Sequence, residues 1–147
     1  MRLTVYSDYA LRLLMYLAVK EDDLATIAEI AEAYGISKNH LTKVAYELGV
    51  AGYVETVRGR GGGLRLARQR AQIRLGDVVR QTEPDMALVP CFEPVDEDCA
   101  IGRCCVLRKA LHKAADAFLE VLDGYTLADL TRPQSALRSL LAIPAAP

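Results

Sequence analysis

The fold is decided by residues 26–66 of this 147-residue chain, which read TIAEIAEAYGISKNHLTKVAYELGVAGYVETVRGRGGGLRL. Apolar residues at helical spacing predict a short helix over 26–34. Gly35 then offers the positive φ that a tight turn needs, and Ser37 is a suitable N-cap for a second helix running towards Ala51. A short helix, a glycine turn and a capped helix in this order predict a helix-turn-helix.

A β-hairpin is predicted directly after this pair of helices. Apolar residues alternate over 53–57 and again over 64–66, and the turn between them, from Arg58 to Gly63, is rich in glycine. Six arginines and no acidic residue lie between Arg58 and Arg74. The sequence therefore predicts a winged helix-turn-helix whose wing is a candidate phosphate-contact surface.

The second helix of the pair has an apolar stripe, which we expect to be buried, and a polar face. The stripe consists of Leu41, Val44, Ala45 and Leu48. The polar face is suited to the major groove of double-stranded DNA, with the wing arginines reaching a neighbouring minor groove or the backbone. A merely solvated basic face is the alternative interpretation. The candidate DNA contacts are Ser37, Lys38, Asn39, His40, Thr42 and Lys43 on the helix, and Arg58 and Arg60 on the wing.

The charge distribution agrees with a DNA-binding N-terminal half. The net charge is only −1, but residues 1–80 carry twelve Lys and Arg against nine Asp and Glu, a net charge of +3, and the remainder carries a net charge of −4.

No apolar run is long enough to cross a membrane and no secretory signal is present, so we expect a cytoplasmic protein. With two histidines and no nucleophile–base or phosphate-loop pattern, an enzyme is not expected.

The flanking regions complete the predicted fold class, which is mostly α with a small β-hairpin wing and a long dimerisation helix. A first helix is expected over 7–20, capped by Ser7 or Asp8, and a short helix over 75–81. The division we expect is a head over 1–82, a cysteine loop over 83–104, a dimerisation helix over 105–125 and a weakly helical tail over 126–147 with a disordered end. The long helix carries an apolar stripe that calls for a partner helix, namely Leu107, Leu111, Ala114, Phe118 and Leu122.

All four cysteines lie within the short segment from Cys91 to Cys105, which indicates a local site. Cys91, Cys99 and Cys105 occupy a loop that ends at a helix, where thiolates can converge on an iron–sulfur cluster or on zinc. Ordinary reduced thiols are the alternative. Cys104 is available as a fourth ligand, but its side chain should diverge from that of its neighbour Cys105, so an oxygen or nitrogen donor from elsewhere is also considered.

Six motifs together resemble the NsrR-type nitric-oxide-sensing iron–sulfur repressors, which are relatives of the IscR-type regulators. The likeness covers nearly the whole chain in the same motif order. The motifs are Met1-Arg-Leu-Thr4, Tyr6-Ser-Asp-Tyr9-Ala-Leu-Arg12, Ser37-Lys-Asn-His-Leu41, Val57-Arg-Gly-Arg-Gly-Gly-Gly63, Leu75-Gly-Asp-Val-Val-Arg80 and Cys105-Val-Leu-Arg-Lys-Ala-Leu111.

The resemblance implies a homodimer with crossing long helices. In each protomer a cluster of the 4Fe–4S kind, with 2Fe–2S as the alternative, would be held by Cys91, Cys99 and Cys105. The family pattern adds Asp8 of the partner subunit as a ligand. The alternative is a purely structural role for Asp8, as a helix N-cap that also pairs with Arg12. IscR-like members use a histidine three residues after the last cysteine, and this chain has Arg108 there, which disfavours histidine ligation.

Two features depart from the family pattern: the first cysteine gap holds seven residues where five are common, and Cys104 is an additional thiol. The resemblance implies that nitric oxide releases the repressor from DNA by removing the bridge between loop and partner. A sensor of iron, cluster supply or redox state is the alternative within the family. A zinc-stabilised protein-binding module is the alternative of another class.

Overall fold

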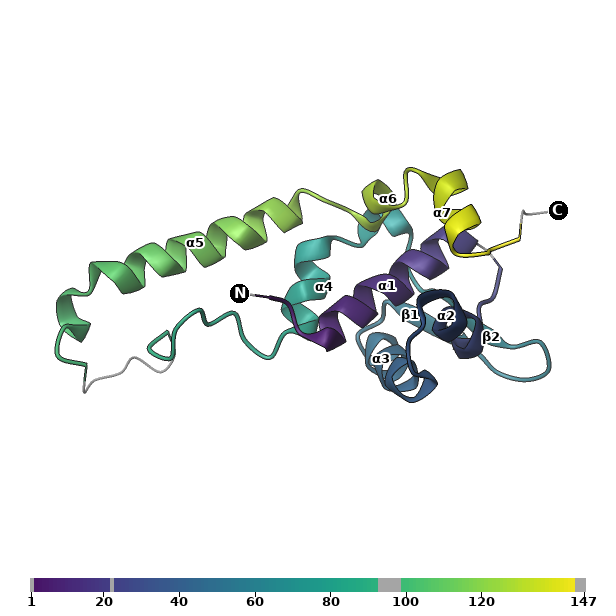
Figure 1. Cartoon of the computed structure of the whole chain (residues 1–147), viewed down its shortest axis with the longest axis horizontal. Helices are drawn as coiled ribbons and strands as arrows, with labels where there is room; N and C mark the ends of the chain where they lie inside the picture. Colours follow the sequence, from purple (N-terminus) through teal and green to yellow (C-terminus); the bar gives the residue numbers. More distant parts are fainter. Residues whose placement is uncertain (1, 22, 93–98, 145–147) are drawn as a thin grey trace.

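The computed structural model describes residues 2–21, 23–92 and 99–144, and it is mostly helical with one antiparallel hairpin, as predicted. Figure 1 shows a rounded head from which one long helix extends. The elements are α1 (Val5–Lys20), α2 (Ile27–Tyr34), α3 (Lys38–Val50), β1 (Val54–Val57), β2 (Gly63–Leu66), a 3-10 turn (Arg70–Gln72), α4 (Leu75–Thr82), a 3-10 turn (Gly102–Cys104), α5 (Val106–Asp123), α6 (Leu127–Leu130) and α7 (Gln134–Leu140).

Helix α1 is the centre of the head. Leu13, Leu14 and Leu17 are fully buried, and the helix packs against α3, α4 and α6. Our predicted cap was wrong: α1 begins at Val5, and its N-cap is Thr4, whose hydroxyl accepts a hydrogen bond from the Ser7 amide. Ser7 is instead a buried residue within the first turn of α1. Its hydroxyl lies within hydrogen-bond distance of Thr82, the last residue of α4, and of Glu83, which follows that helix.

The helix-turn-helix forms as its local sequence indicates. Thr26 and Glu29 make a reciprocal capping box at the start of α2, and Gly35 ends that helix with φ of 65°. Ser37 occupies the N-cap position of α3, but its side chain makes no capping hydrogen bond. The predicted stripe of α3 is buried, with Leu41 and Leu48 essentially inaccessible to solvent.

The wing is short and tied to the head. β1 pairs with β2 so that Val54 faces Leu66, and Ala25 exchanges two backbone hydrogen bonds with Leu64, of 3.0 and 2.7 Å. At the turn, a Cβ added to Gly62 would lie 2.2 Å from the carbonyl oxygen of Val57, so only glycine fits there. The base of the wing is therefore tied to the head through Ala25, and its turn needs glycine at position 62.

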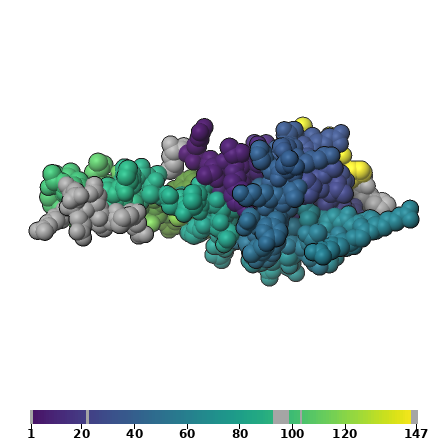
Figure 2. Space-filling view, turned by 90° about the horizontal axis from the view of Figure 1, so that it is seen from below, coloured from purple at the N-terminus to yellow at the C-terminus, as the bar shows by residue number. Residues whose placement is uncertain are grey.

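Helix α5 leaves the head as an arm, which the space-filling view also shows (Figure 2). Its end is held by Arg80 of α4, which donates two hydrogen bonds of 2.7 Å to the carboxylate of Asp123. Ala115 is the one residue of α5 that is buried. Within the described ranges of the chain, no helix is both long and apolar enough to cross a bilayer.

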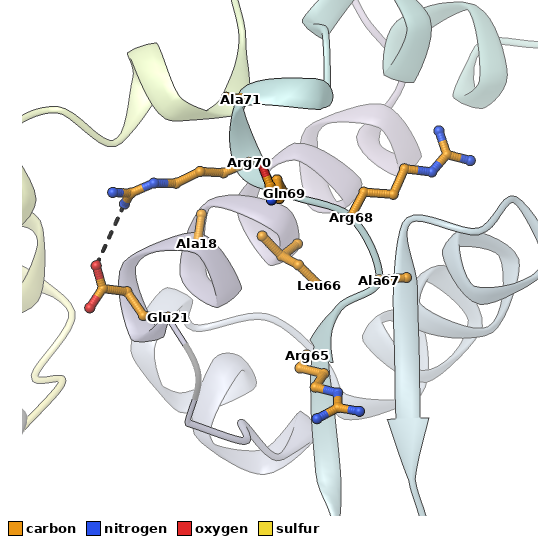
Figure 3. A pocket seen from close by; sticks show the side chains of 9 residues that line it. All are labelled: Ala18, Glu21, Arg65, Leu66, Ala67, Arg68, Gln69, Arg70 and Ala71. Carbon is orange, nitrogen blue, oxygen red and sulfur yellow. Dashed lines mark ion pairs between the residues drawn. The ribbon is translucent and has the colours of Figure 1, made fainter.

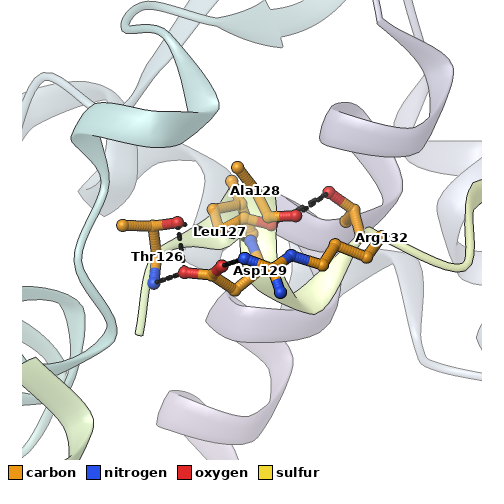
Figure 4. Close-up of polar contacts among 6 residues, drawn as sticks. Thr126, Leu127, Ala128, Asp129 and Arg132 are labelled. Carbon is orange, nitrogen blue, oxygen red and sulfur yellow. Dashed lines mark hydrogen bonds and ion pairs between the residues drawn. The ribbon is translucent and has the colours of Figure 1, made fainter. Parts of the chain in front are cut away.

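The C-terminal segment returns to the head, which the sequence had not indicated. Thr126 and Asp129 form a second capping box, with Arg132 paired to the same carboxylate (Figure 4). Leu127 is buried against α1, and its amide donates to the carbonyl of Ile73 at 2.8 Å. Leu141 and Ile143 are buried as well. The final residues 145–147, which we expected to be disordered, lie outside the described part of the chain.

Candidate nucleic-acid interface and cysteine loop

The outward face of α3 is polar and open to solvent. The structure places all of the helix side chains that we singled out, Ser37, Lys38, Asn39, His40, Thr42 and Lys43, at exposed positions. The first turn of α3 contains no acidic residue, so no negative side chain there opposes the positive end of the helix dipole and the charge of Lys38. Thr42 donates its hydroxyl to the carbonyl of Lys38 at 2.8 Å, which fixes that side chain along the helix.

Sequence reasoning missed Tyr46, which continues the same face. Its side chain is 69% exposed although tyrosine is large and partly apolar. Tyr46 follows Thr42 by four residues and Lys43 by three, so the three side chains share one face of α3. That spacing was the signal that could have identified it.

Of the six arginines between Arg58 and Arg74, the four on or directly beside the hairpin fall into two groups. Arg65 pairs with Glu55 at 2.9 Å, and its guanidinium holds the pKa of that carboxyl below its usual value. Arg68 donates to the carbonyl of Ala51 and lies over the ring of Tyr53. In the described part of the chain, Arg58 and Arg60 at the exposed turn have no ion pair, and so their charges are available to DNA.

The base of the wing borders an open pocket of about 750 Å³ (Figure 3). Arg70 reaches across it towards Glu21, with 3.8 Å between the charged atoms, while Arg65 and Arg68 point in other directions. Because the lining arginines do not converge on one point, the pocket resembles a partly paired basic surface more than a closed anion site.

The two adjacent cysteines at the start of α5 have different environments. Cys105 is the N-cap of α5, and its sulfur accepts a hydrogen bond of 3.3 Å from the Arg108 amide. Cys104 is exposed, and its thiol donates to the carbonyl of Ile101 at 3.6 Å. The two sulfurs thus have different hydrogen-bond partners.

The other end of the cysteine loop docks on the side of α5. Phe92 is buried, and its ring stacks on His112 with 3.8 Å between centroids and 12° between planes. His112 is seven residues after Cys105, which is about 10 Å along the helix. This contact keeps the Cys91 end of the loop beside α5, next to a cavity of about 290 Å³ lined partly by Asp85 and Asp116.

The thiols are not gathered around one point in the single chain. Among the described residues no three His, Cys, Asp or Glu side chains lie close enough together to hold a metal ion. Residues 93–98 of the predicted loop lie outside the described part. By donor chemistry the set fits an iron–sulfur cluster, because Cys91, Cys99 and Cys105 are soft thiol ligands. Cys105 caps α5, and Cys91 directly precedes Phe92, which stacks on the same helix.

Asp8 lies in the first turn of α1 with its side chain 48% exposed. Asp8 is not the N-cap, since Thr4 has that role, so this part of the structural alternative was wrong. It does pair with Arg12 one turn later, at 2.9 Å, as that alternative predicted. The carboxylate thus faces solvent in the single chain, where a partner subunit could approach it.

The apolar stripe of α5 is largely uncovered. Leu107 is 64% exposed, and Ala114 is exposed too, while Leu111, Phe118 and Leu122 are half-buried. Phe118 and Leu122 also border an apolar cavity of about 330 Å³ between α1, α4 and α5. An uncovered stripe of this kind is typical of a helix that packs against another chain.

An open polar helix face beside an arginine-tipped hairpin defines this protein as a winged helix-turn-helix regulator of the DNA-binding class. The model of the Rrf2 family, described as iron-dependent transcriptional regulators, matches residues 3–133. The chain belongs to the Rrf2 family.

Relatives and solved structures agree with this assignment. The HTH-type transcriptional regulator NsrR of Geobacillus kaustophilus is 52% identical over 96% of this chain and 97% of its own length. The NsrR of Bacillus subtilis is 49% identical over 96% of this chain and 97% of its own length. The structure of T. potens IscR is similar with a TM-score of 0.74 and 26% identity, covering 100% of this chain and 94% of that one. CymR, the global cysteine regulator of B. subtilis, gives a TM-score of 0.72 and 29% identity, covering 88% and 95%.

Proposed function

We propose that this protein is a transcriptional repressor that binds promoter DNA as a homodimer and releases it in response to nitric oxide sensed at an iron–sulfur cluster. The observation that carries the proposal is the similarity to NsrR over nearly the whole chain, in a fold that presents α3 and the wing on one head and four cysteines on a separate arm. A regulator of this kind acts in the cytoplasm, where the bacterial chromosome lies.

DNA binding is carried by α3 and the wing. Lys38, Asn39 and Lys43 read or contact the major groove, and Arg58 and Arg60 contact the adjacent minor groove or backbone. Two heads related by the dimer axis then bind half-sites about one helical turn apart. The distance between the two α3 helices is set by how the α5 arms cross.

The sensor is built from the cysteine loop. Cys91, Cys99 and Cys105 would hold the cluster, of the 4Fe–4S kind or alternatively 2Fe–2S, with Asp8 of the partner subunit as a further ligand. When bound, the cluster supplies iron that reacts with nitric oxide. The chain's own part is to tie the loop of one protomer to α1 of the other, and loss of that tie changes the spacing of the two heads.

Iron or redox sensing is the second candidate, and the description of the matching family as iron-dependent favours it. One experiment separates the candidates: an anaerobic visible absorption spectrum of the full-length protein during titration with nitric oxide, with promoter binding followed in parallel. A brown chromophore that bleaches as DNA is released supports the proposal. A chromophore indifferent to nitric oxide but lost on iron chelation selects the second candidate, and a colourless zinc protein contradicts both.

A further inference from the structure

The start of the cysteine loop is bonded to the start of α1 by a polar network that the sequence did not indicate. Oε1 of Glu83 accepts hydrogen bonds from the amide of Thr4 at 2.8 Å, from the hydroxyl of Thr4 at 3.0 Å, and from the hydroxyl of Ser7. Glu83 is the C-cap of α4 and thus the first residue of the segment that leads to Cys91. A single carboxylate oxygen therefore joins two segments nearly eighty residues apart.

The network continues into the protein interior. The oxygen atoms of Ser7 and Thr82 are 2.7 Å apart, and because the Ser7 proton goes to Glu83, Thr82 is the donor in this bond; the carbonyl of Val78, at 2.9 Å, is the alternative acceptor for the same Thr82 proton. Ser7 is 0% exposed and Thr82 is buried as well. Water cannot readily replace these partners, so breaking one bond leaves a buried polar group unsatisfied.

Both ends of the network lead to functional parts. Asp8 follows Ser7 directly, and α1 is packed through its leucines onto α3, the helix that faces DNA. On the other side, the chain runs from Glu83 past Met86 to Phe92, which docks on α5. A displacement of the loop cannot leave α1 unaffected while the carboxylate of Glu83 keeps its donors.

We propose that Glu83 is a positioning residue that couples the cysteine loop to α1, so that a change in the loop is passed to the DNA-binding head of its own protomer. The part that concerns sensing rests on the proposed function, whereas the coupling itself is a property of the chain without any cofactor. A simple helix cap, the competing role, would stabilise α1 and leave the loop unaffected.

Hydrogen–deuterium exchange on the full-length, cluster-free protein tests the coupling. Glu83→Ala removes the acceptor and should speed exchange of the two hydrogen-bonded loop amides, those of Ala87 and Phe92, at least tenfold, together with the amides of residues 5–11. Glu83→Gln keeps an oxygen at the same place and should stay near the wild-type rates. The matched control is Glu32→Ala, which removes an exposed carboxylate on α2 and should change neither segment.

Ser7→Ala separates the two roles more clearly than Glu83→Ala, and it replaces that variant if Glu83→Ala does not fold. It changes only α1, yet coupling requires faster exchange of the Ala87 and Phe92 amides, on the order of fivefold. Wild-type exchange of these two loop amides in both folded variants, whatever α1 does, would overturn the proposal.

A second experiment measures promoter affinity before and after addition of nitric oxide. Glu83→Ala should bring the ratio of the two affinities towards one. If the wild-type protein shows no response to nitric oxide, the proposed function fails, and the exchange result still decides the coupling.

Discussion

Arg80 and Asp123 join α4 to the last turn of α5 through two parallel hydrogen bonds of 2.7 Å each. This pair helps to attach the arm to the head, together with the half-buried Phe118 and Leu122, while most of the rest of α5 is exposed. The hydrogen bonds from Arg80 hold the pKa of the Asp123 carboxyl below its usual value of 3.8.

The stability that this ion pair provides should depend on pH in a defined direction. A carboxyl whose pKa is lowered in the folded state stabilises the protein above its unfolded pKa and loses that effect as the pH falls through the folded value. We therefore expect Asp123→Asn to be less stable than the wild type at neutral pH, and the two melting temperatures to converge below pH 3.8. A difference that persists unchanged at low pH would show that Asp123 acts through packing.

Gly76 makes the approach of Asp123 possible. A Cβ at this position would lie 1.8 Å from Oδ1 of Asp123 and 2.8 Å from Nη1 of Arg80, so Gly76→Ala must push the pair apart. The matched control is Gly49→Ala, since Gly49 is also helical and its Cβ would meet nothing closer than 3.7 Å. Thermal unfolding should show a gain of roughly 0.5–1 kcal/mol for Gly49→Ala and no gain, or a loss, for Gly76→Ala.

The unpaired wing arginines should contribute to DNA affinity through phosphates. We expect Arg60→Ala to weaken promoter binding and to lower the slope of log K against log salt by about 1. Fluorescence anisotropy over a salt series measures both quantities. The control is Arg132→Ala, which removes the same charge from the segment between α6 and α7, and an equal effect of the two variants would remove the wing from the contact surface.

The two kinds of cysteine should behave differently. Cys99→Ala is expected to abolish the visible chromophore of the anaerobically purified protein while a folded dimer remains. Cys104→Ala should keep the chromophore, because the Cys104 thiol faces Ile101 and solvent whereas Cys105 caps α5. Absorption spectra and circular dichroism check both outcomes, and loss of colour in Cys104→Ala would make that thiol a ligand.

The exposed stripe of α5 should form the dimer interface. Leu107→Glu places a charge on that stripe and should shift the protein from dimer to monomer in light scattering coupled to size exclusion. Leu140→Glu on α7 is the control, because Leu140 is also exposed, at 81%, but lies outside the stripe. A dimer that persists with Leu107→Glu would place the interface elsewhere.

Local sequence patterns predicted the helices and the hairpin closely. α3 was predicted to run from Ser37 towards Ala51 and spans Lys38–Val50, and the turn glycine Gly35 has the positive φ that its position required. Capping, helical periodicity and strand alternation involve residues a few positions apart, so each can be interpreted from a short window. The expected exposure of the polar face of α3 followed from the same periodicity.

The sequence by itself thus determined the order of elements, the polar face of α3, the clustered thiols and the family. Only the tertiary structure decided which polar groups pair over long distances: Thr4 rather than Ser7 as the cap of α1, Glu83 as its partner, and Arg80 as the anchor of α5. It also brought Leu127 and the C-terminal helices into the core of the head. These contacts join residues tens of positions apart, and they form only when the whole chain has closed around α1, so no local pattern encodes them.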